Sequence, residues 1–311
     1  MRTVARELVG AGLSLLCGLL TGCVSVVDRD ATKTEASGSI RAAAITASNS
    51  HTCALLRDGE AVCWGGNGRD GQHAPPAGPF TQISFDGEHG CGLKADGSLA
   101  CWGDDENGKL DAPAGALFSQ IDAGPYHKCG LDLAGAVTCW GQVSTANQDD
   151  YPTASGFTAL AVGQTVSCVL DAGGAPTCWG QTPRDPVVTP TGETFSALAA
   201  GSYHVCGLRS DGSATCWGND AHGQLGAPAT PFTALAAGYG FSCGLLASGD
   251  VECWGERPSA KGTEQIWVPM APFTGGSFVS IGAGDFHACG IDAAGKVTCW
   301  GDNFYGQLNV P

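Results

Sequence analysis

Basic residues are scarce in this chain of 311 residues, which has 15 lysines and arginines against 30 aspartates and glutamates and a formal net charge of −15. An acidic surface repels phosphate backbones, so we do not expect the protein to bind nucleic acid. No basic patch or low-complexity tract opposes that expectation.

Long hydrophobic runs are also missing. The apolar run over residues 8–20 follows Arg2 and Arg6, ends in Leu20-Thr21-Gly22-Cys23, and at 13 residues is too short to span a bilayer. It is typical of a signal-peptide core, and its last four residues resemble the lipobox of bacterial lipoproteins, in which the cysteine receives a diacylglycerol. We therefore predict a signal peptide over residues 1–22 and a lipid on Cys23. An ordinary secretory signal with a chance cysteine is the alternative.

The polar residues that follow predict how the protein is held. Residues 23–38 are interpreted as the lipidated cysteine and a short tether, with Asp28, Asp30 and Lys33 among its polar side chains. Lipid chains on Cys23 would anchor the protein to a membrane. We expect an exported cell-envelope lipoprotein, and Val24 after the cysteine resembles cargo of the outer membrane if the envelope is Gram-negative.

Signals for helices and for catalysis are absent as well. No helical periodicity persists for three turns, and the 48 glycines indicate a fold made largely of turns. No nucleophile–base pair, phosphate loop or metal cluster rises above the background of the sequence. We therefore expect no cofactor, no metal and no enzymatic activity.

What the chain does have is a repeat of two cysteines ten positions apart, with Trp-Gly directly after the second. The tryptophans stand at 64, 102, 140, 179, 217, 254 and 300, a period near 39 residues. Seven such units predict one closed array of small β units, an all-β propeller over residues 39–311 with three to four antiparallel strands in each blade. The cysteine pairs are Cys53 and Cys63, Cys91 and Cys101, Cys129 and Cys139, Cys168 and Cys178, Cys206 and Cys216, Cys243 and Cys253, and Cys289 and Cys299.

The spacing inside one repeat predicts a hairpin that brings its two cysteines together. A glycine stands six places after the first cysteine in every unit, where a three-residue hairpin loop needs a left-handed residue. That loop places residues 206 and 216 directly opposite each other. Because export favours oxidation, we predict seven intrablade disulfides, each worth about 3 kcal/mol in the chain-entropy model.

Residues 201–226 and 284–308 resemble the regulator of chromosome condensation repeat. The resemblance covers about residues 39–311 and implies a seven-bladed propeller. The eukaryotic founding member is an exchange factor for the Ran GTPase, and a secreted bacterial relative is a protein inhibitor of β-lactamases that binds through one propeller face. The signal sequence and the acidic surface fit the second kind of role better than the first.

Function is expected where the repeats disagree, at the two residues between the first strand and the second. These residues share one rim with the loops that leave the third strands, and aromatic side chains on a rigid rim are usual anchors for protein binding. Covering the channel mouth is the alternative role. The candidate rim residues are Asn49, Glu88, Tyr126, Gln164, Tyr203, Tyr239, Asp285, Phe286, Trp267, Phe304 and Tyr305.

Two further features leave alternatives open. Trp267 lies in an insertion after Trp254 and would either enter a partner or fold back over its own blade. The histidines two places before the first cysteine are expected to have a structural role, because equivalent positions in different blades diverge around the axis. They are His51, His89, His127, His204 and His287.

The sequence thus favours a monomeric, lipid-anchored, non-enzymatic propeller of the bacterial cell envelope. It would bind an envelope or extracellular protein, or a glycan, through the variable rim, and one form of that role is inhibition of an envelope enzyme. A hydrolase or lyase with carboxylates at the channel mouth is the alternative, and a nucleotide exchange factor is the third.

Overall fold

The computed structural model describes residues 36–37, 40–66, 71–143, 147–181, 187–261 and 264–311. The predicted signal peptide, Cys23 and most of the tether lie outside these residues. Within them, no helix is long and apolar enough to cross a membrane.

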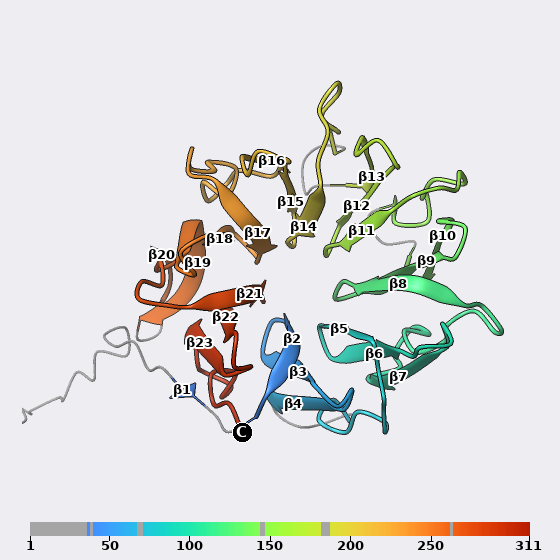
Figure 1. Cartoon of the computed structure of the whole chain (residues 1–311), viewed down its shortest axis with the longest axis horizontal. Coiled ribbons are helices and arrows are strands. Elements are labelled where there is room, and N and C mark those ends of the chain that lie inside the picture. The colour runs from blue at the N-terminus through green and yellow to red at the C-terminus, as the bar shows by residue number, and fades with distance from the viewer. Residues whose placement is uncertain (1–35, 38–39, 67–70, 144–146, 182–186, 262–263) are drawn as a thin grey trace, which may run out of the picture. The chain divides into compact units, whose positions relative to one another are not determined.

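Seven small antiparallel sheets stand side by side in a ring (Figure 1). We number them as blades 1 to 7 in chain order, each built around one cysteine pair. The first three blades consist of β2 (Ala42–Ala47), β3 (His51–Leu56) and β4 (Ala61–Gly65); β5 (Gln82–Asp86), β6 (His89–Leu93) and β7 (Leu99–Gly103); and β8 (Phe118–Ala123), β9 (His127–Asp132) and β10 (Val137–Gly141). The described strands therefore confirm the predicted all-β propeller.

The remaining blades repeat the same plan, and the last two have a fourth strand. Blades 4 and 5 consist of β11 (Ala159–Val162), β12 (Val166–Leu170) and β13 (Pro176–Gly180), and of β14 (Ala197–Ala200), β15 (His204–Leu208) and β16 (Ala214–Gly218). Blade 6 contains β17 (Phe232–Ala237), β18 (Phe241–Leu246), β19 (Val251–Lys261) and β20 (Glu264–Pro269). Blade 7 contains β21 (Phe278–Ala283), β22 (His287–Asp292), β23 (Val297–Gly301) and the short β1 (Ala36–Ser37).

The ring is closed by the N-terminal strand. β1 pairs antiparallel with β23, with Ala36 opposite Cys299 and Ser37 opposite Thr298, so blade 7 is built from both ends of the propeller (Figure 1). The outermost strand of the last blade thus comes from the segment that precedes the first blade.

Each cysteine pair is directly opposed in its ladder, as the hairpin spacing predicts. Cys206 faces Cys216 in the β15–β16 ladder, and the same register holds in the other six blades. The hairpin glycine has a positive φ in every blade, for example +86° at Gly212, which any other residue adopts only at a cost. The short loop therefore determines which residues face each other.

All seven predicted disulfides are present, one in each blade, with Cα atoms 4.0 to 4.1 Å apart. This confirms the predicted pairing for every cysteine of the repeat. In blade order the bridges join Cys53 to Cys63, Cys91 to Cys101, Cys129 to Cys139, Cys168 to Cys178, Cys206 to Cys216, Cys243 to Cys253, and Cys289 to Cys299.

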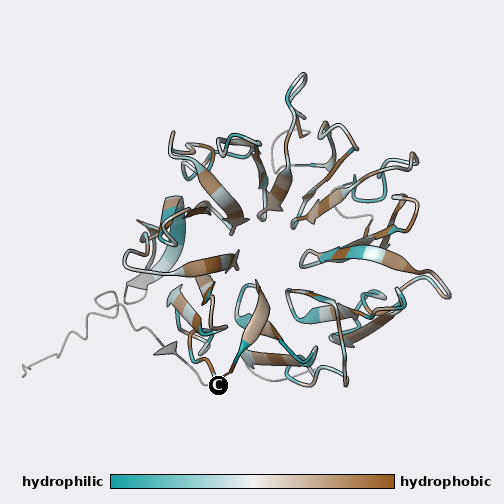
Figure 2. Ribbon diagram, in the orientation of Figure 1, coloured by the Kyte–Doolittle hydropathy of each residue, from teal (hydrophilic) through white to brown (hydrophobic). Residues whose placement is uncertain are grey.

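The core lies between neighbouring blades rather than inside one. Phe195 and Trp217 of blade 5, with ring centroids 5.3 Å apart, belong to one cluster with Leu170 of blade 4. Phe118 and Trp140 of blade 3, 5.6 Å apart, belong in the same way to one cluster with Leu93 of blade 2. Hydrophobic residues run along the strands, whereas most hydrophilic residues lie in the loops (Figure 2). The Trp-Gly repeat is therefore a packing element, because each of its seven tryptophans is buried.

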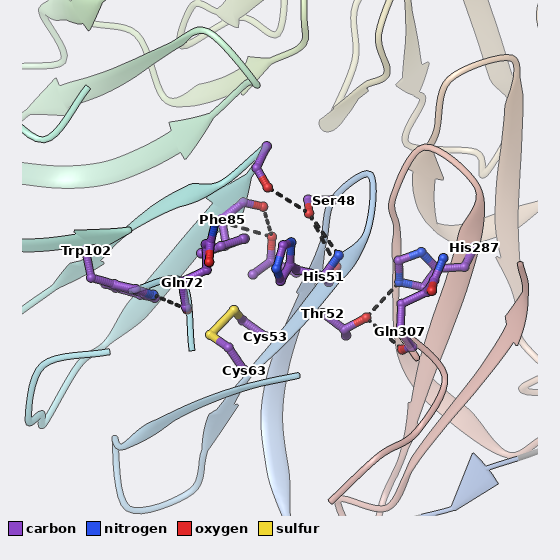
Figure 3. Close-up of a disulfide and its surroundings, with 12 residues drawn as sticks. Ser48, His51, Thr52, Cys53, Cys63, Gln72, Phe85, Trp102, His287 and Gln307 are labelled. Atoms are coloured by element: carbon purple, nitrogen blue, oxygen red, sulfur yellow. Dashed lines mark hydrogen bonds between the residues drawn. A yellow bond between two sulfur atoms is a disulfide. The ribbon is translucent and has the colours of Figure 1, made fainter. Parts of the chain in front are cut away.

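In three blades the indole N–H of the tryptophan also joins its blade to the one before it. The indole N–H of Trp102 donates to the carbonyl oxygen of Gln72 at 3.2 Å (Figure 3). The indole N–H of Trp64 donates to the carbonyl oxygen of Gln307 at 2.9 Å. The Gly-Gln-Leu stretch after the third strand is thus a connection that caps the next blade. Because Gln307 and Trp64 lie in blades 7 and 1, the same contact also closes the ring.

The repeated histidines form hydrogen bonds across the seams between blades. Nε2 of His287 lies 2.7 Å from Oγ1 of Thr52 in the next blade (Figure 3), and Nε2 of His204 lies 2.7 Å from Oγ of Ser242. The Thr52 hydroxyl donates to the Gln307 carbonyl oxygen, so the imidazole N–H donates to the hydroxyl. These buried imidazoles hold neighbouring blades together.

Candidate binding surface

The two loops of each blade that were expected to share a rim do so. The backbone N–H of Asn219, which follows the third strand of blade 5, donates to the carbonyl oxygen of Tyr203 at 2.9 Å. The same bond joins Asp104 to Glu88 in blade 2 and Asp302 to Phe286 in blade 7. We call this edge of the ring the variable rim.

Aromatic side chains from three consecutive blades meet on the variable rim. Tyr239 of blade 6 is in contact with Tyr203 of blade 5 at a centroid distance of 5.3 Å and with Phe286 of blade 7 at 6.3 Å. Trp267 lies 5.8 Å from Tyr239 and stacks on His222, with centroids 3.3 Å apart and planes 15° apart. These five residues form what we call the aromatic cluster, and each keeps part of its surface exposed.

The insertion that carries Trp267 folds back onto the ring and reaches the neighbouring blade 5. The insertion continues β19 beyond the blade and returns as β20, with Pro258 opposite Trp267. The return strand brings the indole over the rim, against His222 of blade 5. Trp267 is therefore part of the rim surface and does not extend freely into solvent.

The other predicted rim residues lie around the ring. Tyr126 accepts a hydrogen bond from the Gln164 amide at 3.3 Å, joining blades 3 and 4. Phe304 and Tyr305 form an edge-to-face pair on blade 7, 4.9 Å apart, and are 69% and 46% exposed. Asn49 and Glu88 are exposed on blades 1 and 2, while the aromatic cluster belongs to blades 5, 6 and 7.

Three aspartates converge on the central channel, and only one of them was a candidate from the sequence. Asp86, Asp122 and Asp285 all line a cavity of about 100 Å³ that the inner strands enclose. Asp285 accepts a hydrogen bond from the Ser202 hydroxyl at 2.9 Å, which links blades 5 and 7. Asp122 accepts from the Ser84 hydroxyl and from the Val162 N–H, which links blades 2, 3 and 4.

Burial changes the acidity of these three carboxyls. It raises the pKa of Asp122 and of Asp285 to about 6. The pKa of Asp86 is raised well above its usual value, first by burial and then by the negative charge of Asp285. Asp86 stands where the corresponding residue in five other blades is glycine, so this exception in the repeat was the signal that could have revealed it.

A buried lysine was also missed. Lys128 occupies the place that Thr52, Ser167 and Ser242 take in other blades, and its ammonium donates to Nδ1 of His89 and to the Lys109 carbonyl oxygen, both at 2.8 Å. Burial, together with repulsion from Lys109, lowers the pKa of Lys128 to about 7. The Lys128–His89 hydrogen bond therefore joins blades 2 and 3, as the histidine–hydroxyl bonds join other blades.

By its fold, the protein is a disulfide-bonded, seven-bladed β-propeller, and one edge of its ring varies from blade to blade. Three segments, residues 42–72, 195–224 and 278–307, match the family model for the regulator of chromosome condensation (RCC1) repeat. The last two segments overlap residues 201–226 and 284–308, where the sequence resembles this repeat.

Solved structures from eukaryotes share the architecture. The CRINKLY WD40 ectodomain of the Arabidopsis thaliana receptor kinase ACR4 is 25% identical, with a TM-score of 0.67, and the match covers 89% of this chain and 100% of that one. The ectodomain of the Physcomitrella patens receptor kinase CR4 is 26% identical, with a TM-score of 0.68 and coverage of 86% and 74%. Prp20p of Saccharomyces cerevisiae, studied for its binding to Gsp1p and histones, is 18% identical, with a TM-score of 0.60 and coverage of 89% and 86%.

No curated protein sequence matches the chain. Among the residues that the structure describes, no group of three or more histidine, cysteine, aspartate or glutamate side chains is arranged to hold a metal ion. The aromatic cluster is the rim feature that most resembles a recognition surface.

Proposed function

We propose that this protein is a non-enzymatic binding propeller that engages an envelope or extracellular protein through the aromatic cluster on its variable rim. The observation that carries the proposal is the meeting of Tyr203, Tyr239, Phe286 and Trp267 on one edge of a rigid ring. Large aromatic side chains bind with little loss of conformational entropy, which is why they dominate protein interfaces.

The scaffold suits this role because it is rigid and oxidised. Seven disulfides in the described part of the chain indicate an oxidising, extracytoplasmic location. The proposed lipid on Cys23 would hold the ring at a membrane surface. Inhibition of an envelope enzyme is a narrower form of this function, in which the rim would cover the enzyme's active site.

The test is capture of envelope and extracellular proteins on the purified full chain. We expect a saturable partner that is lost when Tyr203→Ala, Tyr239→Ala and Phe286→Ala are combined. The matched control is Leu133→Ala on the opposite edge of the ring, where Leu133 is 79% exposed. A partner that the triple variant still captures would rule out this rim. Mass spectrometry of the mature chain tests the anchor, and an unmodified Cys23 would contradict it.

An enzymatic role is the second candidate, and the three channel aspartates favour it. A carboxyl with a raised pKa beside an ionised one is the usual arrangement for acid–base chemistry. Against it, Asp122 already accepts hydrogen bonds from Ser84, Ala123 and Val162, so its oxygens serve the scaffold. Hydrolysis or elimination of envelope glycans that Asp86→Asn and Asp285→Asn abolish would establish this role in place of the first.

A further inference from the structure

The insertion in blade 6 compensates for a missing side chain on the rim. Gly240 occupies the second variable position, where the other blades carry a side chain. A Cβ at Gly240 would lie 3.0 Å from Cζ3 of Trp267, 3.1 Å from Cδ2 of His222 and 2.7 Å from the Glu256 carbonyl oxygen. The corresponding residues are Ser50, Glu88, Tyr126, Thr165, Tyr203 and Phe286.

Trp267 therefore takes the place of a blade 6 rim residue, and the β19–β20 hairpin delivers it. Its ring stacks on His222 and also contacts Tyr239, so the indole is already oriented before any partner arrives. A ring fixed in this way presents its π-electrons to a ligand at little entropic cost.

Negative charge surrounds these aromatic faces. The Glu256 carboxylate, 41% exposed, lies 3.9 Å from Nδ1 of His222 and thus beside the Trp267 stack. Asp220 is exposed two residues before His222, and the backbone N–H of Asp302 donates to the carbonyl oxygen of Phe286. Further exposed carboxylates continue along the same rim at Glu88, Asp105, Glu106, Asp149 and Asp150.

The lysines of the blade 2–3 seam do not offset this charge at the surface. Lys109 is 8% exposed and forms an ion pair with Asp104 at 2.7 Å. Lys128 is 1% exposed and donates inward to His89. The aromatic cluster thus has the carboxylates of Glu256 and Asp220 near it, an environment that a guanidinium group recognises by stacking and by paired hydrogen bonds.

We propose that the rim of blades 5 to 7 takes a protein segment that carries arginine side chains, stacked on Trp267 and Tyr239 and paired with Glu256. The proposal rests on the proposed function and names the chemistry of its partner. Arginine fits better than lysine because its planar fork stacks and binds a carboxylate at the same time.

The test uses a short synthetic peptide of alternating arginine, glycine and leucine, and a matched peptide with glutamate in place of arginine, titrated against the purified full chain by calorimetry. We expect the arginine peptide alone to bind, and added salt to weaken its binding. Trp267→Ala and Glu256→Lys should each lower the affinity about tenfold, because the first removes the stacking surface and the second removes the paired carboxylate. Glu60→Lys, the same charge change on the opposite edge, should leave the affinity within about twofold.

Equal binding of the two peptides, or arginine-peptide binding that Trp267→Ala and Glu256→Lys leave unchanged, would overturn the inference. It would leave the proposed function intact if the captured protein is still lost with the aromatic triple variant. If the peptide test fails and the triple variant still captures the protein, the proposed function is removed as well. Because Glu256→Lys changes only an exposed side chain, it tests the inference even if Trp267→Ala disturbs the hairpin.

Discussion

Single residues that depart from the repeat determine the chemistry of the channel. Asp86 replaces a glycine and brings a carboxylate next to Asp285, so each disfavours ionisation of the other. The hydrogen bond from the Gly87 N–H to Asp86 offsets part of that cost. Folding therefore disfavours the ionised form of Asp86 relative to the neutral acid.

Asp86→Asn should stabilise the protein at neutral pH. The pKa of Asp86 is raised on folding, so the folded state binds more protons and the wild-type carboxyl costs most above that pKa. We expect a gain on the order of 1 kcal/mol or more at pH 7 that disappears near pH 4, measured by urea unfolding at both pH values. A gain of equal size at pH 4 would show that the charge is not the cause.

Lys128 should make the free energy of unfolding rise with pH above neutral pH, whereas Asp86 makes it fall with rising pH. Because its pKa is lowered to about 7, the folded state loses a proton there that the unfolded chain keeps until about pH 10.5. Stability should rise between pH 7 and pH 9 by on the order of 1–2 kcal/mol, and Lys128→Met should lack this rise. The comparison between pH values removes any constant cost of the substitution. Identical slopes for both proteins would contradict the assignment.

At the scale of elements, the seams between blades follow a pairing rule. In four blades the histidine two places before the first cysteine lies within hydrogen-bond distance of a polar side chain of the next blade. The pairs are His287 with Thr52, His127 with Ser167, His204 with Ser242, and His89 with Lys128. Where blade 4 carries Val166, blade 5 offers Val205, and where blade 6 carries Phe241, blade 7 offers the small Ala288. Polar residues pair with polar and apolar with apolar across the ring.

A double-mutant cycle at the blade 5–6 seam tests this rule. His204→Val alone should cost about 1–3 kcal/mol, because the buried Ser242 hydroxyl loses its partner. His204→Val with Ser242→Val recreates the apolar pair of Val166 and Val205 and should recover much of the loss. We expect a coupling energy above about 1 kcal/mol in thermal or urea unfolding. Strictly additive effects would mean that the two residues do not act as a pair.

Blade 1 is the exception to this rule. His51 faces Gly90 of blade 2, which offers no side chain, and Phe85 packs against the imidazole instead at a centroid distance of 5.7 Å. Burial lowers the pKa of His51 to about 4, so the ring stays neutral there. The five histidines resemble a metal array in the sequence, yet each one acts locally at its own seam.

At the scale of the whole molecule, the propeller itself was predictable because its signals are local. A fixed cysteine spacing and a hairpin glycine determine the register inside each blade, and seven copies of about one length leave few ways to pack. The channel carboxylates were not predictable in the same way. Asp86 and Asp285 lie in the second and seventh blades, and only closure of the ring brings them together.

The rim was predictable only in part from the sequence. Tyr203, Tyr239 and Phe286 were candidates because they stand at equivalent variable positions, and consecutive blades place them side by side. The position of Trp267 could not be inferred, since a long insertion has no equivalent in the other repeats. Gly240 was a usable signal in hindsight, because a bare rim position marks where another element lies.

The most direct test of the central claim, that the variable rim is a protein-binding surface, is site-specific photocrosslinking of the full chain in the cells that produce it. A photoreactive phenylalanine analogue would replace Tyr203, Phe304 or Tyr305 on the rim, or Leu133 on the opposite edge as the control. We predict discrete adducts with another protein from the rim positions and none from Leu133. Adducts from Leu133 alone, or equally from both edges, would contradict the account.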